Sequence, residues 1–259
     1  MSAAVDLRER LRRYYTAYYR DTLGIPTWAT LVGLREEEEE RLEAPRLERL
    51  RRRVGSDALR GRVLNVGCGT GGFNVVATGT GACAVGVDDD SEAIAICGVK
   101  ARKVGGAFVQ AHAEALPFAD GVFDLVHCFS VIEHVASVEA SVAEMVRVAR
   151  PGGAIYVHTP NAWSLWEGHY KVFWLPFLPP PLARLYLRLR GRPTAYLATL
   201  RRLTPGRLRR AFAQAGVRDA ERYEDTPARE SVGPLRGLSR LYYRVTGASP
   251  FIELVARKR

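Results

Sequence analysis

A cluster of glycines directly after a short apolar run is the first sign of chemistry in this chain. The run is Arg62 to Val66, and the cluster is Gly67, Gly69, Gly71 and Gly72. Glycines permit positive φ and a close approach of backbone N–H groups to a ligand, and a helix beginning near Phe73 would direct its positive end to the same place. This pattern favours a nucleotide-sized ligand, although glycine-rich turns also occur without one.

Asp88 is placed to bind a ribose. It ends a second apolar run, Ala82 to Val87, and lies 21 residues after Gly67, which is the spacing of a ribose-binding carboxylate. In an open α/β sheet the tips of neighbouring strands face one crevice, so Asp88 would meet a ligand held by the glycines. Asp90 is expected to cap a helix beginning near Ser91, and Asp89 is the alternative ribose contact.

Four further motifs follow in order. Residues 113–118 read AEALPF, 123–126 read FDLV, 133–135 read EHV, and 150–153 read RPGG. Together with the glycines and Asp88, they resemble the class I S-adenosylmethionine-dependent methyltransferases, in particular the small-molecule group similar to the ubiquinone and menaquinone methyltransferases. The resemblance covers about residues 62–161.

The resemblance implies S-adenosylmethionine as cofactor and a doubly wound, Rossmann-like α/β fold with a seven-stranded sheet of order 3-2-1-4-5-7-6. It implies cofactor contacts at Gly67, Cys68, Gly69, Thr70, Gly71, Asp88, Asp89, His112, Ala113, Glu114 and Phe129. His112 is a departure, since the family usually has an aspartate there. The Ala113 N–H can still donate to adenine, but the side-chain contact to the exocyclic amine is put in doubt.

The implied reaction is in-line methyl transfer, which for a hydroxyl acceptor requires removal of a proton. The candidate catalytic residues are His134 with its neighbour Glu133, just beyond the fourth strand, and His169. The alternative for His134 is a residue at a helix start that bonds its neighbours. His158 lies within a predicted strand, where a structural role is more common.

We predict no metal ion. The ubiquinone-type enzymes that this region resembles are thought to hold magnesium at an E-x-x-E-H motif, whereas this chain has Ser130, Glu133 and His134 at the corresponding positions. One carboxylate ligand is therefore missing.

The wider pattern alternates strands with helices, which predicts a parallel sheet covered on both faces. Strands are expected near 62–66, 83–88, 107–110, 123–129 and 154–159, with the last two at 218–223 and 250–257. Helices are expected near 73–77, 91–104, 136–149 and 205–215, the last capped by Thr204.

Two segments lie outside this pattern. Residues 1–55 are predicted to form an N-terminal helical extension whose tyrosine-rich face is either core or part of the closure over the crevice. Residues 56–259 are predicted to be the methyltransferase domain, with an aromatic cap insertion at 161–203. The run Glu36 to Glu40 is expected to be a solvated helix face.

Basic side chains gather in the second half of the chain. Residues 168–218 contain eleven basic and no acidic side chains, in a protein of net charge +10. Such a surface attracts phosphates, acidic lipids or nucleic acid, and the alternative is a plain solubilising surface. We expect peripheral contact with an anionic membrane. No membrane span or signal peptide is evident, which favours a cytoplasmic protein, and the four cysteines are expected to be small buried thiols.

The leading interpretation is O-methylation of a small-molecule, lipid-linked or glycan-type acceptor. A nucleic-acid methyltransferase suits the charge, but residues 128–131 read CFSV rather than the N/D-P-P-Y/F tetrad of base amino-group methylation. An NAD-dependent oxidoreductase suits the glycines and Asp88 but not the later motifs. A non-catalytic binding module that kept the fold is a further alternative. The motifs identify neither the acceptor nor the oligomeric state.

Overall fold

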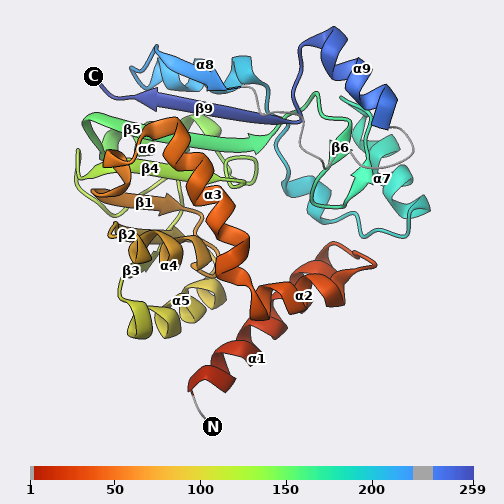
Figure 1. Cartoon of the computed structure of the whole chain (residues 1–259). Helices are drawn as coiled ribbons and strands as arrows, with labels where there is room; N and C mark the ends of the chain where they lie inside the picture. Colours follow the sequence, from red (N-terminus) through yellow and green to blue (C-terminus); the bar gives the residue numbers. More distant parts are fainter. Residues whose placement is uncertain (1–2, 224–235) are drawn as a thin grey trace.

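The core of the protein is a seven-stranded sheet with helices on both faces (Figure 1). The computed structural model describes residues 3–223 and 236–259. The strand order is β3-β2-β1-β4-β5-β9-β8, in which β9 runs antiparallel to both its neighbours. This confirms the predicted doubly wound, Rossmann-like order 3-2-1-4-5-7-6.

The strands lie close to their predicted positions. The bounds of the sheet strands are β1 Arg62–Val66, β2 Cys83–Asp88, β3 Ala107–Gln110, β4 Phe123–Phe129, β5 Ala149–Pro160, β8 Ala220–Tyr223 and β9 Phe251–Arg257. In the parallel register Val66 pairs with Val87 and with Cys128. The carboxyl ends of β1, β2 and β4 therefore meet at one edge, where an open α/β sheet binds its ligand.

Alternating side chains of the strands supply two cores. On one face, Val63 and Leu125 pack under α3 (Glu39–Val54) and α4 (Gly72–Gly79). On the other face, Leu64 and Val126 pack under α6 (Val138–Val148) and α8 (Pro205–Gln214). Burial alternates with a period of two because successive side chains of a pleated strand point to opposite faces. The two cores therefore anchor the functional edge of the sheet on both sides.

Local capping signals define where several helices begin. The Asp90 carboxylate accepts from the N–H groups of Glu92 and Ala93 at the start of α5 (Ser91–Val104), and the Thr204 hydroxyl accepts from Arg207 N at the start of α8. Both caps were predicted. Ser137 does the same for α6 through Ala140 N. Each cap satisfies a backbone donor that the helix itself leaves unpaired.

The N-terminal region comprises α1 (Ala3–Thr16), the π-helix η1 (Ala17–Thr22), α2 (Trp28–Glu37) and α3. A short 3-10 helix, η2 (Asp57–Leu59), then leads into the sheet. Figure 1 shows α1 and α2 beside the carboxyl edge of the sheet, below the segment that contains β6 and α7.

The prediction of a solvated glutamate run was wrong for Glu39. Its side chain is buried and pairs with the Lys100 ammonium of α5 and the Thr70 hydroxyl. Lys100 also donates to the Thr70 carbonyl at 2.6 Å. A buried charge requires such partners, and here they tie the start of α3 to the glycine cluster.

The segment after β5 carries a small hairpin, β6 (Trp166–Glu167) with β7 (Val172–Phe173), followed by α7 (Pro180–Leu189) and the 3-10 helix η3 (Tyr196–Thr199). Its own apolar cluster contains Tyr170, Trp174 and Leu187 together with Leu23 and Ile25 from the N-terminal region. This segment, residues 161–203, which is called the cap below after its predicted role, shares one hydrophobic core with the N-terminal region. The remaining helix, α9 (Arg236–Thr246), packs against the cap through Tyr243, which accepts from Leu165 N at 2.8 Å.

Three of the four cysteines, Cys68, Cys97 and Cys128, are buried as predicted, whereas Cys83 is exposed at the start of β2. The expectation of buried thiols was therefore wrong for Cys83. Within residues 3–223 and 236–259, no helix has the length and apolar character needed to cross a bilayer.

Lys100→Met should lower the free energy of unfolding by about 3 kcal/mol, because Glu39 would keep a buried charge without its cation. Chemical denaturation measures this. Lys103→Met, one turn further along α5 and exposed, is the matched control and should change stability by less than about 0.5 kcal/mol. Equal effects of the two substitutions would contradict the structural role of the buried pair.

Candidate functional site

A cleft with a volume of about 1090 Å³ lies at the carboxyl ends of β1, β2 and β4. Most of the predicted cofactor-binding residues line it: Gly67, Cys68, Gly69, Thr70, Asp88, Asp89, His112, Ala113, Glu114 and Phe129. His134 lines it as well, as do Tyr14, Tyr15 and Tyr18 of the N-terminal region. Residues far apart in the sequence thus enclose one space large enough for a cofactor and part of a second ligand.

The glycine loop has a conformation and a packing that larger residues would not fit. Gly67 has φ +70°, and a Cβ there would lie 2.0 Å from Cγ2 of Val131. Gly69 has φ +52° and open space where its Cβ would stand. Gly71, at φ +80°, lies at the N-terminus of α4 and would bring a Cβ to 2.9 Å from Cys97 Sγ. The loop therefore keeps its backbone close to the cleft.

The Asp88 carboxylate is held at the tip of β2 by two backbone hydrogen bonds. Gly69 N donates to Oδ2 at 2.7 Å, and Asp90 N donates to Oδ1 at 3.0 Å. Burial raises the pKa of Asp88, and these bonds offset only part of that rise. Sequence reasoning treated Asp88 only as a ribose contact; the structure adds the role of fixing the glycine loop.

The side chains after β3 differ in what they can offer a ligand. His112 is exposed and its Nδ1 lies 3.5 Å from a carboxylate oxygen of Asp89. Glu114 accepts from Ala136 N at 2.7 Å and Ser137 N at 3.1 Å, so its carboxylate holds the loop that leads into α6. The structure thus places His112, Ala113 and Glu114 beside the cleft, with Oε1 of Glu114 engaged by the protein itself.

A second cavity of about 470 Å³ lies under the cap and adjoins the first. Trp166, Trp174 and Phe177 give it apolar walls, while Glu133, Glu167 and His169 provide polar groups. Arg201 lines both cavities. Glu133 lines the cavity under the cap and His134 lines the larger cleft, so these two adjacent residues stand where the two spaces approach each other.

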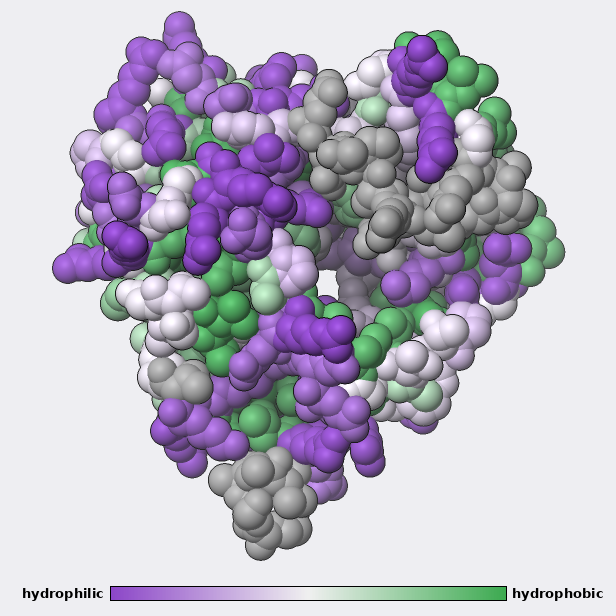
Figure 2. Space-filling model, viewed as in Figure 1, coloured by the Kyte–Doolittle hydropathy of each residue, from purple (hydrophilic) through white to green (hydrophobic). Residues whose placement is uncertain are grey.

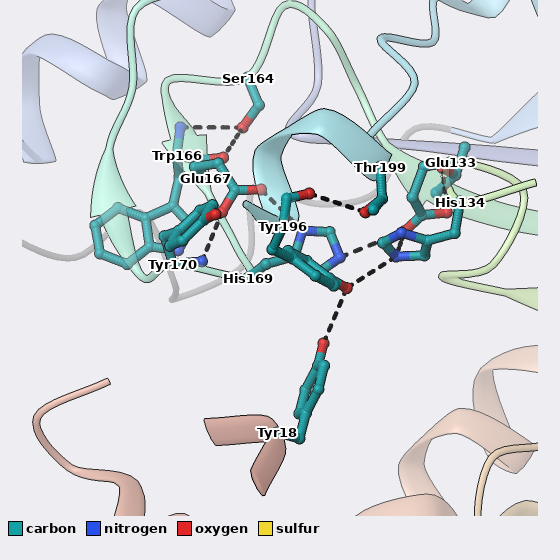
Figure 3. A network of polar contacts seen from close by, with 11 residues as sticks. Tyr18, Glu133, His134, Ser164, Trp166, Glu167, His169, Tyr170, Tyr196 and Thr199 are labelled. Atoms are coloured by element: carbon teal, nitrogen blue, oxygen red, sulfur yellow. Dashed lines mark hydrogen bonds and ion pairs between the residues drawn. The ribbon is translucent and has the colours of Figure 1, made fainter. Parts of the chain in front are cut away.

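The three predicted catalytic side chains come together at this junction (Figure 3). Oε1 of Glu133 lies 3.8 Å from Nε2 of His169 and 3.9 Å from Nε2 of His134. Oε2 accepts from the Thr159 hydroxyl at 2.9 Å, whereas Oε1 has no hydrogen-bond partner among the described residues. The cluster therefore contains one buried carboxylate oxygen that is open to a proton donor.

The environment shifts the pKa values of all three groups. Burial raises the pKa of Glu133 to about 7, although the His169 charge opposes it. Burial, with the His169 charge, lowers the pKa of His134 to about 4. Burial also disfavours the charged form of His169, but the hydrogen bond between its Nδ1 and Glu167 at 2.8 Å and the nearby carboxylates outweigh it and raise its pKa. Near neutral pH, His134 is neutral and Glu133 is poised to take up a proton.

Two partners in this cluster were not identified from the sequence, namely Glu167 and Tyr196. The Tyr196 hydroxyl lies 3.3 Å from Nε2 of His134 and 3.2 Å from the Tyr18 hydroxyl, so it connects the cap, the cluster and α1–η1 (Figure 3). The only signal for Glu167 was its position two residues before His169, which is a weak indication of contact.

The remaining candidate base, His158, does not belong to the cluster. It is buried in β5, stacks on Phe129 with ring centroids 4.1 Å apart, and lies 3.2 Å from Arg49 Nη1 through its Nε2. Its position agrees with the structural role that was expected for a histidine inside a strand.

Comparison with known protein families identifies the part of the chain that contains the glycine loop and strands β1 to β4. Residues 64–157 match the family model described as a methyltransferase domain, and the sheet order is the one expected for the class I type. Residues 64–157 form a methyltransferase domain. The resemblance seen in the sequence motifs is thereby confirmed.

Known relatives agree with this assignment. Over 164 residues the chain is 32% identical to a ubiquinone biosynthesis O-methyltransferase of Aromatoleum aromaticum, which covers 62% of this chain and 65% of the relative, slightly less than two thirds of its length. A SAM-dependent methyltransferase structure from Archaeoglobus fulgidus superimposes with a TM-score of 0.56 at 18% identity, covering 85% of this chain and 95% of that one.

The same fold supports other chemistry. The cyclase SpnF has a TM-score of 0.53 at 20% identity, with 82% of this chain and 81% of that one covered. At these identities the likeness shows the fold alone, so the reaction must be argued from the side chains of the site.

Glu133→Gln should make stability less dependent on pH. In the parent protein, native Glu133 keeps its proton up to about pH 7, whereas unfolded chains release it near pH 4.5. The native state then binds more protons, so its stability falls as pH rises between these values. Glutamine cannot ionise, and the free energy of unfolding of the variant, relative to the parent, should increase steadily from pH 5 to pH 7.5.

Denaturation at several pH values measures this difference. His169 adds a decline of its own above pH 6.5 in both proteins, because its raised pKa stabilises the folded state only while the imidazole is protonated. Glu92→Gln, on the exposed first turn of α5, is the control. A difference between Glu133→Gln and the parent that stays constant with pH would contradict the raised pKa.

Proposed function

We propose that the protein is an S-adenosylmethionine-dependent methyltransferase that methylates a hydroxyl group of a small-molecule, lipid-linked or glycan-type acceptor. The observation that carries this proposal is that Glu133 lines one cavity while its neighbour His134 lines the other, and Arg201 lines both. The cavity at His134 is lined by the glycine loop and Asp88, and the cavity at Glu133 is lined by the aromatic side chains of the cap. Such an arrangement suits a cofactor and an acceptor that must meet at one point.

The residues of the larger cleft fit the cofactor. The glycine loop allows backbone N–H groups to approach a ligand, and each Asp88 oxygen retains a lone pair for a ribose hydroxyl beside its backbone bond. Ala113 and Phe129 line the same cleft, as do Tyr14 and Tyr15 of the N-terminal region. When bound, S-adenosylmethionine supplies an activated methyl group, so the protein must chiefly hold the acceptor in line and accept its proton.

Glu133 is the best proton acceptor in the site. Its Oε1 is buried, has no hydrogen-bond partner among the described residues, and lines the cavity under the cap. A pKa of about 7 is close to the optimum for general base catalysis at neutral pH. His134, the first candidate from the sequence, is a weaker base because of its lowered pKa, and we assign it to positioning through Tyr196.

His169 would balance the charge at Glu133. Its Nδ1 is held by Glu167, and its Nε2 faces Oε1 of Glu133. An imidazolium there would favour the carboxylate form that accepts a proton, and it would then stabilise the site as charge moves during the reaction. The three residues predicted from the sequence thus take three distinct roles.

The apolar walls and basic rim of the cap favour an amphipathic or anionic acceptor. The curated relative named above is a quinone O-methyltransferase, which supports acceptors with an apolar body. We therefore propose that residues 161–203 act as a cap over the acceptor within a methyltransferase domain spanning residues 56–259, with residues 1–55 as its N-terminal extension. A cytoplasmic protein that contacts an anionic membrane at its periphery fits such an acceptor.

Two other functions have less support. The segment after β4 lacks the tetrad that is typical of base amino-group methylation, which disfavours a nucleic-acid methyltransferase. An NAD-dependent oxidoreductase would use the glycine loop and Asp88 but would leave the Glu133 cluster without a role.

Asp88→Ala should weaken S-adenosylmethionine binding at least 100-fold, because the ribose would lose charge-assisted hydrogen bonds. Isothermal titration calorimetry measures the affinity. The loss of the bonds from Gly69 and Asp90 should also lower stability by roughly 2 kcal/mol, so measurements belong well below the melting temperature. Asp57→Ala, on the exposed helix η2, is the control. Unchanged affinity of Asp88→Ala would move the ribose contact to Asp89 or reject the pocket.

Chelation should leave activity unchanged within about twofold. The residues Glu133, His134 and His169 have the donor types of a metal site, but Ser130 stands where the resembled enzymes have a further carboxylate. The assay follows transfer of labelled methyl groups from S-adenosylmethionine to lipid extracts, with and without EDTA. Activity lost to EDTA and restored by magnesium would overturn the metal-free mechanism.

A further inference from the structure

Two helices that are distant in the sequence share one eight-residue pattern. In α7, residues 182–189 read LARLYLRL, and in α9, residues 238–245 read LSRLYYRV. Five of the eight positions are identical, and the other three exchange alanine for serine, leucine for tyrosine and leucine for valine. Such agreement between two separate helices indicates that both have the same structural role.

Burial follows the same pattern in both helices. The second and sixth positions are buried, namely Ala183 and Leu187 in α7 and Ser239 and Tyr243 in α9. The first, fourth and eighth positions are apolar and exposed: Leu182, Leu185 and Leu189 at 53%, 51% and 77%, and Leu238, Leu241 and Val245 at 56%, 57% and 76%. Each helix therefore docks by one narrow face and presents a leucine-rich face to the outside.

These exposed apolar side chains are concentrated at one end of the molecule. Among the described residues, ten large hydrophobic side chains are exposed; six lie on α7 and α9, and three more, Trp163, Leu175 and Phe177, lie in the cap. Only Leu42 lies elsewhere. An exposed apolar concentration of this kind marks an interaction surface.

Contacts connect the two helices to each other. The Tyr242 hydroxyl of α9 donates to the Trp163 carbonyl at 3.1 Å, and the Trp163 ring packs edge-on against Phe177, three residues before α7, with centroids 4.6 Å apart. Figure 1 shows α7 and α9 at the same end of the molecule, and in Figure 2 hydrophobic surface gathers along the outer edge of that end.

Arginines border both apolar faces. The third and seventh positions are Arg184 and Arg188 in α7 and Arg240 and Arg244 in α9, all exposed, and none forms an ion pair within residues 3–223 and 236–259. Residues 236–252 contain no acidic side chain, as is also true of residues 168–218. An apolar stripe bordered by unpaired arginines is complementary to a bilayer with anionic headgroups, because the stems can lie along the apolar region while the guanidinium groups meet phosphates.

We propose that α7 and α9 together form the docking surface for an anionic lipid bilayer, with Trp163 and Phe177 at its centre. The proposal rests on the membrane part of the proposed function and names the two elements that carry it. Phe177, Pro180 and Arg184 belong both to this surface and to the lining of the cavity that ends at Glu133. An acceptor held in the membrane could therefore enter that cavity without crossing water.

Flotation of the full-length protein with vesicles tests the proposal. At low ionic strength, vesicles of phosphatidylcholine with phosphatidylglycerol should recover the protein, and phosphatidylcholine alone should recover at least fivefold less. Recovery should fall as salt screens the arginines. Brominated acyl chains should quench tryptophan emission, which reports insertion rather than adsorption, because Trp163 lies at the proposed centre.

Variants separate the contributions of the two helices. Arg184→Gln with Arg188→Gln, and Arg240→Gln with Arg244→Gln, should each reduce recovery at least fivefold. Leu238→Gln, Leu241→Gln and Val245→Gln together should abolish the quenching. The matched control is Arg209→Gln with Arg210→Gln, two exposed arginines on α8, which should bind like the parent. Calorimetric affinity for S-adenosylmethionine serves as the folding control and should be the same in every variant.

Several outcomes would overturn the proposal. They are failure of the parent to float with anionic vesicles, parent-like flotation of both α9 variants, and equal losses in the α8 control. Retention on duplex DNA without flotation would assign the surface to nucleic acid instead. Because flotation is scored without cofactor, a parent that floats but does not bind S-adenosylmethionine would reject the proposed activity while leaving the docking surface intact.

Discussion

The buried ion pair between Glu39 and Lys100 is the contact on which the site depends most. Both side chains are removed from water, and both contact Thr70 in the glycine loop. A charge in that position is tolerated only with its partner, so the start of α3 and the body of α5 are both fixed on the loop. The Tyr15 hydroxyl, 2.8 Å from the Thr70 hydroxyl, adds α1 to the same point.

These contacts at Thr70 also determine how the cleft is enclosed. With α1 and α3 fixed on the loop, Tyr14, Tyr15 and Tyr18 form one wall of the cofactor cleft, and Tyr18 reaches Tyr196 of the cap. Tyr196 in turn contacts His134. The glycine loop, the helical extension and the cap are therefore linked by hydroxyl contacts that end at His134, beside the proposed proton acceptor Glu133.

The sequence predicted what depends on local chemistry or on a shared pattern. The strands, their order and the caps at Asp90 and Thr204 were predicted because each is specified by neighbouring residues or by motifs in order. Glu39 was not, since within a run of five glutamates nothing local distinguishes the one that meets Lys100. The roles of Glu133 and His134 also depended on tertiary structure, because burial rather than residue type decides which of the two is the better base.

The apolar core shared by the cap and by Leu23 and Ile25 has a consequence for how such proteins diversify. A lineage that acquires a new acceptor by altering the cap must also preserve the fit against residues about 150 positions earlier in the chain. Changes in the two segments are then expected to be paired in evolution. A chimera that exchanges the cap alone would inherit a mismatched core, so the unit of exchange is the cap together with the segment around Leu23.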